Sequence, residues 1–173
     1  ADIDNWRWAG VPFFLRTGKR MPEKRTSVSI QFKPVPHSIF GQASIHDMTP
    51  NRLVIDLQPD EDISLTLMNK APGLSSGGMR LQSLPLSLSL LSTYEGAGGR
   101  RRIAYERLLL DVIQGDATLF VRRDEVEEAW RWVDGVADAW AEARLEPKPY
   151  AAGSWGPSGA FALIERFGKA WSD

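Results

Sequence analysis

Cysteine is absent from the 173 residues of this sequence, and histidine occurs only twice, at His37 and His46. The lack of cysteine excludes a disulfide scaffold, a cysteine nucleophile and thiolate metal sites. A histidine that acts as a general base or a metal ligand needs a second positioned partner. Neither histidine has such a partner nearby in the sequence, so we expect both to be surface residues, with no metal site.

Strong net charge and long apolar runs are missing as well. The formal net charge is −1, which gives no general attraction to nucleic acid or to a membrane surface. No run approaches the roughly 20 apolar residues of a transmembrane helix, and no signal-peptide pattern is visible. With 43% apolar and 25% charged residues, the composition is typical of a folded soluble domain, and the absence of cysteine fits a cytoplasmic protein. The length predicts one domain over residues 1–173.

A complete dinucleotide-binding loop is also lacking. Gly96, Gly98 and Gly99 resemble the start of one, but the third glycine of that motif would fall at Arg101. No strand–helix–strand unit surrounds the segment, so it is not expected to bind a coenzyme. The glycines and three consecutive arginines instead predict a mobile loop over residues 96–102.

The first half of the chain alternates apolar and polar residues, which is the period of half-buried strands. Acidic residues 60–62 separate two of these segments and predict an antiparallel hairpin. Pro85 suits the start of a strand or an edge strand, because proline cannot donate to a central ladder. The predicted strands cover residues 28–32, 53–57, 63–67 and 84–90.

The second half changes to a helical period. Apolar residues recur at helical spacing over 105–113, and Gly115 ends that helix. A second helix is predicted from Asp124 as N-cap, with its tryptophan stripe in the core. A third, short helix starts near Ser158. Strands followed by helices predict an α+β fold, a mostly antiparallel sheet with helices packed on one face.

A basic cluster lies before the first strand and contains a glycine that permits a tight turn. Phosphate recognition needs fixed cations and backbone N–H groups close to the ligand. On the residues alone the cluster favours a solvated basic loop over a phosphate site, because short basic runs are common. Its cations are Arg16, Lys19, Arg20, Lys24 and Arg25, with Gly18 as the glycine.

Several blocks, in order and spacing, resemble the C-terminal half of glucose-6-phosphate dehydrogenase. The segment Arg16-Thr-Gly-Lys19 is similar to the Arg-x-Gly-Lys segment of that family, and residues 122–130 resemble bacterial members most closely. The matching blocks are residues 5–19, 51–59, 69–73, 104–115, 120–132 and 148–157.

The resemblance implies a fragment of a longer NADP-dependent enzyme that oxidises glucose 6-phosphate to 6-phosphogluconolactone in the pentose phosphate pathway. In that family an N-terminal Rossmann domain binds NADP and an upstream histidine is the base, so both would be absent from this chain. The C-terminal domain completes the sugar-phosphate pocket and forms the oligomer contact through its sheet, as a dimer or tetramer. The chain alone is therefore expected to be inactive.

The resemblance also implies roles for particular residues. Lys19 and Lys24 match two family lysines that bind the substrate, and Gln58 matches a position near it. Animal members build a second, structural NADP site on these strands, but the matching positions here are Asp56, Ser64 and Thr66. These side chains supply neither cations nor a stacking ring, so no coenzyme-binding residue is predicted. The alternative function is a standalone phosphosugar-binding or scaffold domain without catalysis.

Overall fold

The computed structural model describes residues 1–35, 37, 48–72, 81–89 and 104–172. The chain forms two compact units: Ala1–Gly98 with Tyr150–Asp173, and Gly99–Pro149. The first unit holds a sheet, the basic cluster and one helix, and the second holds two helices. His46 and the loop expected at residues 96–102 lie outside the described residues, whereas His37 is exposed.

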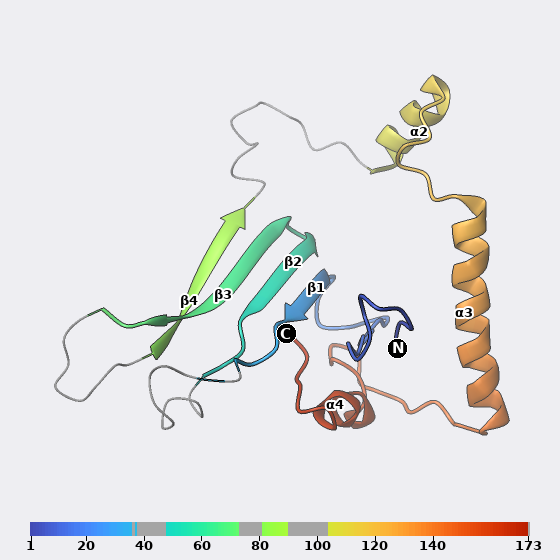
Figure 1. Ribbon diagram of the computed structural model, residues 1–173. Helices are drawn as coiled ribbons and strands as arrows, with labels where there is room; N and C mark the ends of the chain where they lie inside the picture. The colour runs from blue at the N-terminus through green and yellow to red at the C-terminus, as the bar shows by residue number, and fades with distance from the viewer. Residues whose placement is uncertain (36, 38–47, 73–80, 90–103, 173) are drawn as a thin grey trace. The chain divides into compact units, whose positions relative to one another are not determined.

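The first unit is built on an antiparallel sheet whose strands follow one another in chain order (Figure 1). All four strand predictions are confirmed, and with the helices that follow them they confirm the α+β class. Pro85 lies within the last strand, which is an edge of this sheet, as proline requires. The strands are β1 Thr26–Gln31, β2 Arg52–Gln58, β3 Asp62–Lys70 and β4 Leu81–Ser89.

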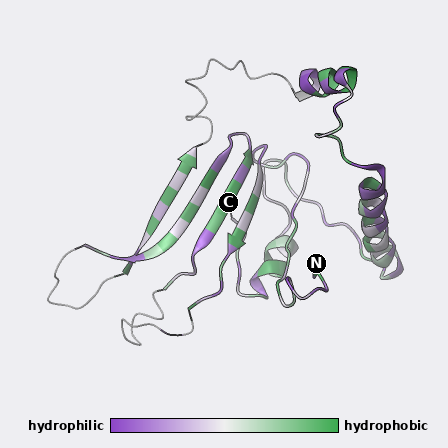
Figure 2. Ribbon diagram, turned by 45° about the horizontal axis from the view of Figure 1, so that its top comes forward, coloured by the Kyte–Doolittle hydropathy of each residue, from purple (hydrophilic) through white to green (hydrophobic). Residues whose placement is uncertain are grey.

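One face of the sheet is aliphatic from edge to edge. The register places Ile30 opposite Leu53, Leu53 opposite Leu65, and Leu65 opposite Leu86. Hydrophobic and hydrophilic residues alternate along each strand, as the bands in Figure 2 show. This alternation and the register together put the aliphatic side chains on one face. This face is open: Leu86 is 49% exposed and Ile30 43% exposed. An apolar surface of this kind is characteristic of an interface.

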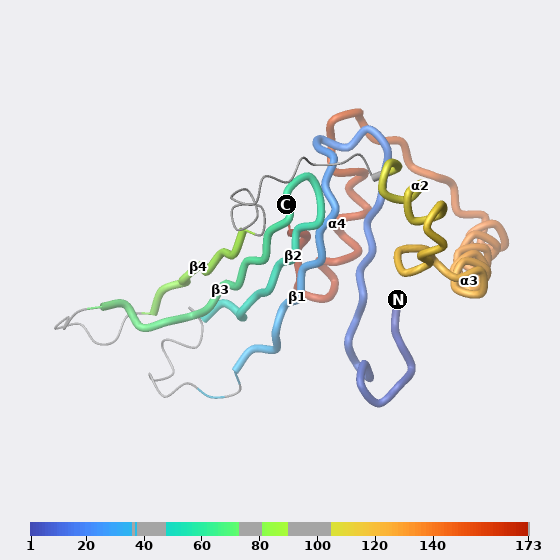
Figure 3. Tube along the Cα trace, turned by 90° about the horizontal axis from the view of Figure 1, so that it is seen from above, coloured from blue at the N-terminus to red at the C-terminus, as the bar shows by residue number. Residues whose placement is uncertain are grey.

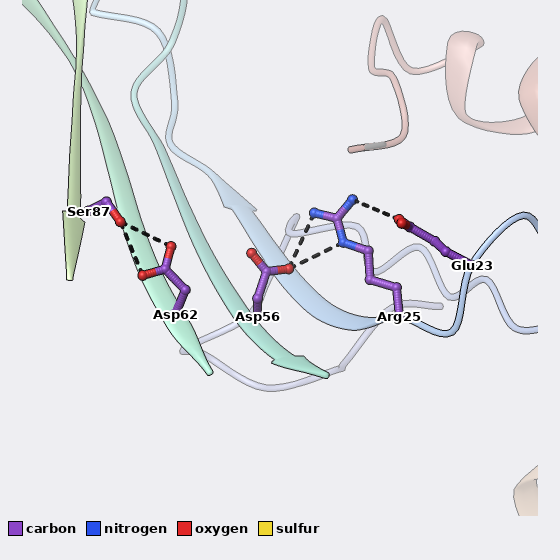
Figure 4. A network of polar contacts seen from close by, with 5 residues as sticks. All are labelled: Glu23, Arg25, Asp56, Asp62 and Ser87. Atoms are coloured by element: carbon purple, nitrogen blue, oxygen red, sulfur yellow. Dashed lines mark hydrogen bonds and ion pairs between the residues drawn. The ribbon is translucent and has the colours of Figure 1, made fainter. Parts of the chain in front are cut away.

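The opposite face of the sheet is polar and contains two carboxylates directly across from each other. Asp56 on β2 pairs in register with Asp62 on β3, and like charges in such positions repel. Each carboxylate has its own donor (Figure 4): Arg25 bonds Asp56 at 3.2 and 3.3 Å, and the Ser87 hydroxyl lies 3.1 Å from both oxygens of Asp62. Asp62 thus belongs to β3 and not to the link, which consists of residues 59–61.

The second unit contains α2 Ala104–Gln114 and α3 Arg123–Glu142. Gly115 ends α2 with a φ of 71°, the left-handed value that glycine adopts without strain. The N-cap of α3 is Arg122 and not Asp124 as predicted. The Asp124 carboxylate is bonded by the Arg122 guanidinium at 2.6 and 3.0 Å, while Glu125 accepts from the Arg122 backbone N–H.

The tryptophan stripe of α3 is exposed, contrary to the expected core position. Trp130 is 61% exposed and Trp140 58% exposed, and α3 contains no buried residue. The helical period identified which residues share a face, but it cannot say whether another element covers that face. Among the described residues, no helix is long and apolar enough to cross a membrane.

The third helix, α4 Ser158–Glu165, starts where predicted and belongs to the first unit. It contains Ile164, which at 5% exposure is the one buried hydrophobic side chain among the described residues. Phe161 is half-buried, as expected of an inward residue. Phe167 lies beyond the helix and is 56% exposed.

The Arg25–Asp56 pair gives a first prediction about stability. Both side chains are about three-quarters buried, so the pair should be worth more than an exposed one. In a double-mutant cycle with Arg25→Ala and Asp56→Ala, we expect a coupling free energy of about 1 kcal/mol in urea unfolding.

The control is the exposed Arg123–Glu127 pair of α3, whose atoms are 3.9 Å apart. Its coupling should be no more than about 0.5 kcal/mol. Additive effects of Arg25→Ala and Asp56→Ala would show that their ion pair does not fasten the start of β1 to β2.

Candidate functional site

The predicted basic cluster forms one loop, residues 16–25, which we call the basic loop. It contains neither helix nor strand and leads directly into β1. Since no ladder holds it, its conformation depends on contacts with other segments. Those contacts come from β2 and from the last part of the chain.

Arg16 is held by two tryptophans. Its guanidinium carbon lies 4.6 Å from the ring centroid of Trp155 and 4.7 Å from that of Trp171. A guanidinium over an indole face is attracted by the ring quadrupole, more so when water is excluded. Arg16 is half-buried between the rings, so its charge is used to fix the loop.

The residues before Arg16 pack on the same C-terminal segment. The Phe14 ring stands edge-on to Phe167 at 5.1 Å and to Trp171 at 6.4 Å. The Trp171 indole N–H donates to the Ala160 carbonyl at 3.0 Å, which fixes its orientation. The two segments run side by side in Figure 3 although about 150 residues separate them.

The turn that carries Lys19 is held through its backbone. The Tyr150 hydroxyl donates to the Lys19 carbonyl at 2.6 Å. The Gly153 N–H donates to the Arg20 carbonyl at 2.8 Å. Arg20 has a φ of 54°, a left-handed value that costs a non-glycine residue about 1 kcal/mol or more.

Gly18 is required by this packing. A Cβ on Gly18 would lie 3.0 Å from the Met21 sulfur and 3.2 Å from the Tyr150 hydroxyl. Both separations are tighter than ordinary van der Waals contact, so a larger residue would require Met21 and Tyr150 to shift by a few tenths of an ångström. The glycine expected from the sequence to permit a tight turn also permits this close approach.

The other end of the basic loop is fastened to the sheet by Arg25. Its guanidinium contacts Asp56 on β2 at 3.2 Å and Glu23 at 3.7 Å (Figure 4). Asp56 is one of the positions that match the structural NADP site of animal members. Its carboxylate faces an arginine here, and its negative charge does not fit a phosphate group.

The three predicted substrate residues are all exposed. Gln58 ends β2 opposite Thr26, whose hydroxyl lies 3.4 Å from the Gln58 amide oxygen. The sheet therefore brings Gln58 beside the end of the basic loop that carries Lys24. In the part of the chain that the structure describes, no hydrogen bond joins the side chains of Lys19, Lys24 and Gln58 to one another.

Chemically, the loop offers two exposed ammonium groups on a backbone fixed at both ends, which suits a phosphorylated ligand. The described residues contain no cluster of three or more side chains able to hold a metal ion. Sequence reasoning missed four residues that hold this loop, which we call the C-terminal clasp: Tyr150, Gly153, Trp155 and Trp171. Two tryptophans beside a Pro- and Gly-rich segment were the available signal, since such rings are seldom left without a packing role.

The fold is that of a dehydrogenase C-terminal domain. The model of the glucose-6-phosphate dehydrogenase C-terminal domain matches residues 1–172. The chain therefore belongs to the glucose-6-phosphate dehydrogenase family, as the sequence blocks indicated.

Individual relatives agree with this assignment. The chain is 53% identical to glucose-6-phosphate 1-dehydrogenase of Zymomonas mobilis, over all of this chain and 35% of that protein. It is 52% identical to the enzyme of Rhizobium meliloti, again over all of this chain and 34% of that protein. The chain thus spans about a third of the length of the curated relatives it matches.

Two solved structures share the fold. A glucose-6-phosphate dehydrogenase in complex with its substrate glucose-6-phosphate superposes with a TM-score of 0.78 at 32% identity, covering 99% of this chain and 34% of that one. Glucose-6-phosphate 1-dehydrogenase from Mycobacterium avium gives a TM-score of 0.72 at 35% identity, covering 99% of this chain and 33% of that one. The predicted α+β architecture is confirmed by both.

Proposed function

We propose that this chain is the substrate-binding and oligomerising C-terminal domain of a cytoplasmic, NADP-dependent glucose-6-phosphate 1-dehydrogenase of the pentose phosphate pathway. The observation that carries the proposal is the basic loop: its backbone is fixed by the C-terminal clasp and by Asp56, while Lys19 and Lys24 remain exposed. A relative of the same fold was solved with glucose-6-phosphate, which supports a sugar phosphate as the ligand.

In this proposal Lys19 and Lys24 bind the phosphate of glucose 6-phosphate. A phosphate monoester carries close to two negative charges at neutral pH, so two ammonium groups neutralise it and donate hydrogen bonds to its oxygens. Gln58, at the end of β2, supplies an amide for a further polar contact with the substrate. Together these residues bind and orient the sugar, and holding it in one pose lowers the barrier of the following step.

The chemical step belongs to a part of the enzyme that this chain does not contain. The NADP that an N-terminal Rossmann domain would hold would accept the hydride from C1 of the sugar, and a histidine upstream of this chain would take the proton of the C1 hydroxyl, giving 6-phosphogluconolactone. No residue of this chain is assigned to either role. In this proposal the chain contributes binding energy and orientation for the same substrate.

Removing the Lys19 charge tests the substrate site. In the full-length enzyme, Lys19→Ala should raise the KM for glucose 6-phosphate about ten-fold or more, because a charged hydrogen bond is worth about 1.5–3 kcal/mol. The KM for NADP and the melting temperature should stay constant, since the side chain is exposed and the coenzyme lies in another domain.

The matched control is Lys33→Ala, which removes an exposed lysine beyond the other end of β1. It should leave both KM values unchanged. If the KM for glucose 6-phosphate is unchanged in Lys19→Ala and in the Lys19/Lys24 double variant, the basic loop is only a solvated surface.

The chain by itself should show no dehydrogenase activity. Hydride transfer needs a bound nicotinamide and a base near C1 of the sugar, and the proposal places both elsewhere. A spectrophotometric assay of the purified 173-residue chain with glucose 6-phosphate and NADP should give no reduction above background. Turnover by the chain would refute the proposal that the coenzyme and the base lie elsewhere. The standalone binding domain would be favoured if the chain binds the sugar phosphate and the source genome encodes no full-length enzyme.

The chain should also self-associate through the open aliphatic face of its sheet. Light scattering at micromolar concentration should give a dimer or a larger species, since exposing this face to water is unfavourable. Leu86→Glu should weaken the assembly, because it buries a charge in an apolar contact. Ser83→Glu, on the polar face of the same strand β4, should not. A wild-type monomer would contradict a preformed interface on this face.

A further inference from the structure

We propose that Tyr150 is a positioning residue for Lys19: its hydroxyl holds the backbone from which the lysine side chain projects, without touching the substrate. The inference rests on the proposed function of the basic loop. Its basis is the 2.6 Å hydrogen bond from the Tyr150 hydroxyl to the Lys19 carbonyl, between residues 131 positions apart.

The hydrogen bond acts together with a second one on the next residue. Tyr150 holds the Lys19 carbonyl and the Gly153 N–H holds the Arg20 carbonyl at 2.8 Å. The two peptide planes that flank Arg20 are thereby held, and with them the φ and ψ angles of Arg20. Because the Cα of Lys19 lies in the first of these planes, the point from which its side chain projects is held as well.

These hydrogen bonds are needed because the local backbone conformation is strained. Arg20 has a φ of 54°, in a region that L-residues avoid unless their surroundings hold them there. No strand ladder or helix supports residues 16–25. Without the tyrosine hydroxyl, the Lys19 carbonyl would lose its donor and the turn could relax toward a commoner conformation.

Gly153 and Gly18 make the approach of Tyr150 possible. Gly153 has a φ of 79°, so the chain reverses three residues after Tyr150 and returns its N–H to the loop. Gly18 leaves the space that the hydroxyl occupies, since a Cβ there would lie 3.2 Å away from it. A glycine in each of the two contacting segments therefore helps the tyrosine hydroxyl to reach the Lys19 carbonyl.

Holding the backbone at Lys19 affects binding of the sugar phosphate more than the rate of the chemical step. A lysine side chain is flexible, and a loop that must be ordered when the substrate arrives weakens its affinity. Pre-ordering the backbone removes part of that cost before binding. Loss of the hydroxyl should therefore raise the KM for the sugar phosphate and leave kcat constant.

The test is Tyr150→Phe in the full-length enzyme, which removes only the hydroxyl. The KM for glucose 6-phosphate should rise about three- to ten-fold, as expected for one hydrogen bond, with kcat and the KM for NADP unchanged. Tyr105→Phe is the matched control, since Tyr105 is 74% exposed on α2 and should change nothing. An unchanged KM in Tyr150→Phe would overturn the inference.

A double variant shows whether the tyrosine acts through the lysine. In a Lys19→Ala background, Tyr150→Phe should have no further effect on the KM for glucose 6-phosphate. If the two effects multiply instead, Tyr150 acts on something other than Lys19 and the inference is wrong. If Lys19→Ala has no effect, the proposed substrate site fails first, and the inference with it.

A melting temperature separates positioning from loss of folding. Tyr150→Phe should melt within a few degrees of the wild type, since one exposed hydrogen bond contributes little to global stability. Trp171→Leu, which removes one ring from Arg16 and one ring contact from Phe14, serves as a purely structural comparison. It should lower the melting temperature clearly. A KM change in Tyr150→Phe that appears only with an equally large loss of melting temperature would overturn the positioning role.

Discussion

The contact between the basic loop and the C-terminal clasp is the interaction on which the candidate site depends. Arg16 lies between two tryptophan rings, and the carbonyls of Lys19 and Arg20 accept hydrogen bonds from the same distant segment. Cation–π attraction, ring packing and two backbone hydrogen bonds are individually modest. They act on a loop with no secondary structure of its own, so together they decide where its exposed lysines lie.

The sheet supplies the second fixed point of the basic loop, and it also carries an open aliphatic face. Arg25 joins the loop to Asp56 and, by neutralising that carboxylate, also relieves its repulsion with Asp62 across the strands. The other face of the same strands is aliphatic and open, and among the described residues the only strongly buried side chains are Ile164 and Asp111. Many large apolar side chains in the described part of the chain therefore remain exposed.

The sequence was a good guide wherever structure follows from local period. Alternation located all four strands, Gly115 marked the end of α2, and Pro85 indicated an edge strand. It failed where the outcome depends on competition or on distance. Asp124 is a good N-cap residue, but the neighbouring arginine takes its carboxylate. The basic cluster was identified, whereas its partition into structural cations (Arg16 and Arg25) and exposed ones required knowing that Trp171 and Asp56 lie beside it. The periodicity of a sequence does not show which distant residues come into contact.

The distance between the basic loop and Trp171 along the chain has a consequence for biosynthesis. A ribosome that adds about 5–20 residues per second completes Trp171 on the order of ten to thirty seconds after Arg16. During that interval the hairpins of the sheet can form from neighbouring strands, but Arg16 and Phe14 have no rings to pack against. The exposed lysines of the basic loop therefore acquire their geometry last, and a nascent chain released before Trp171 would carry a formed sheet and an unformed basic loop. Loss of the segment that carries Trp171 would leave a protein that retains its strands but lacks an ordered basic loop.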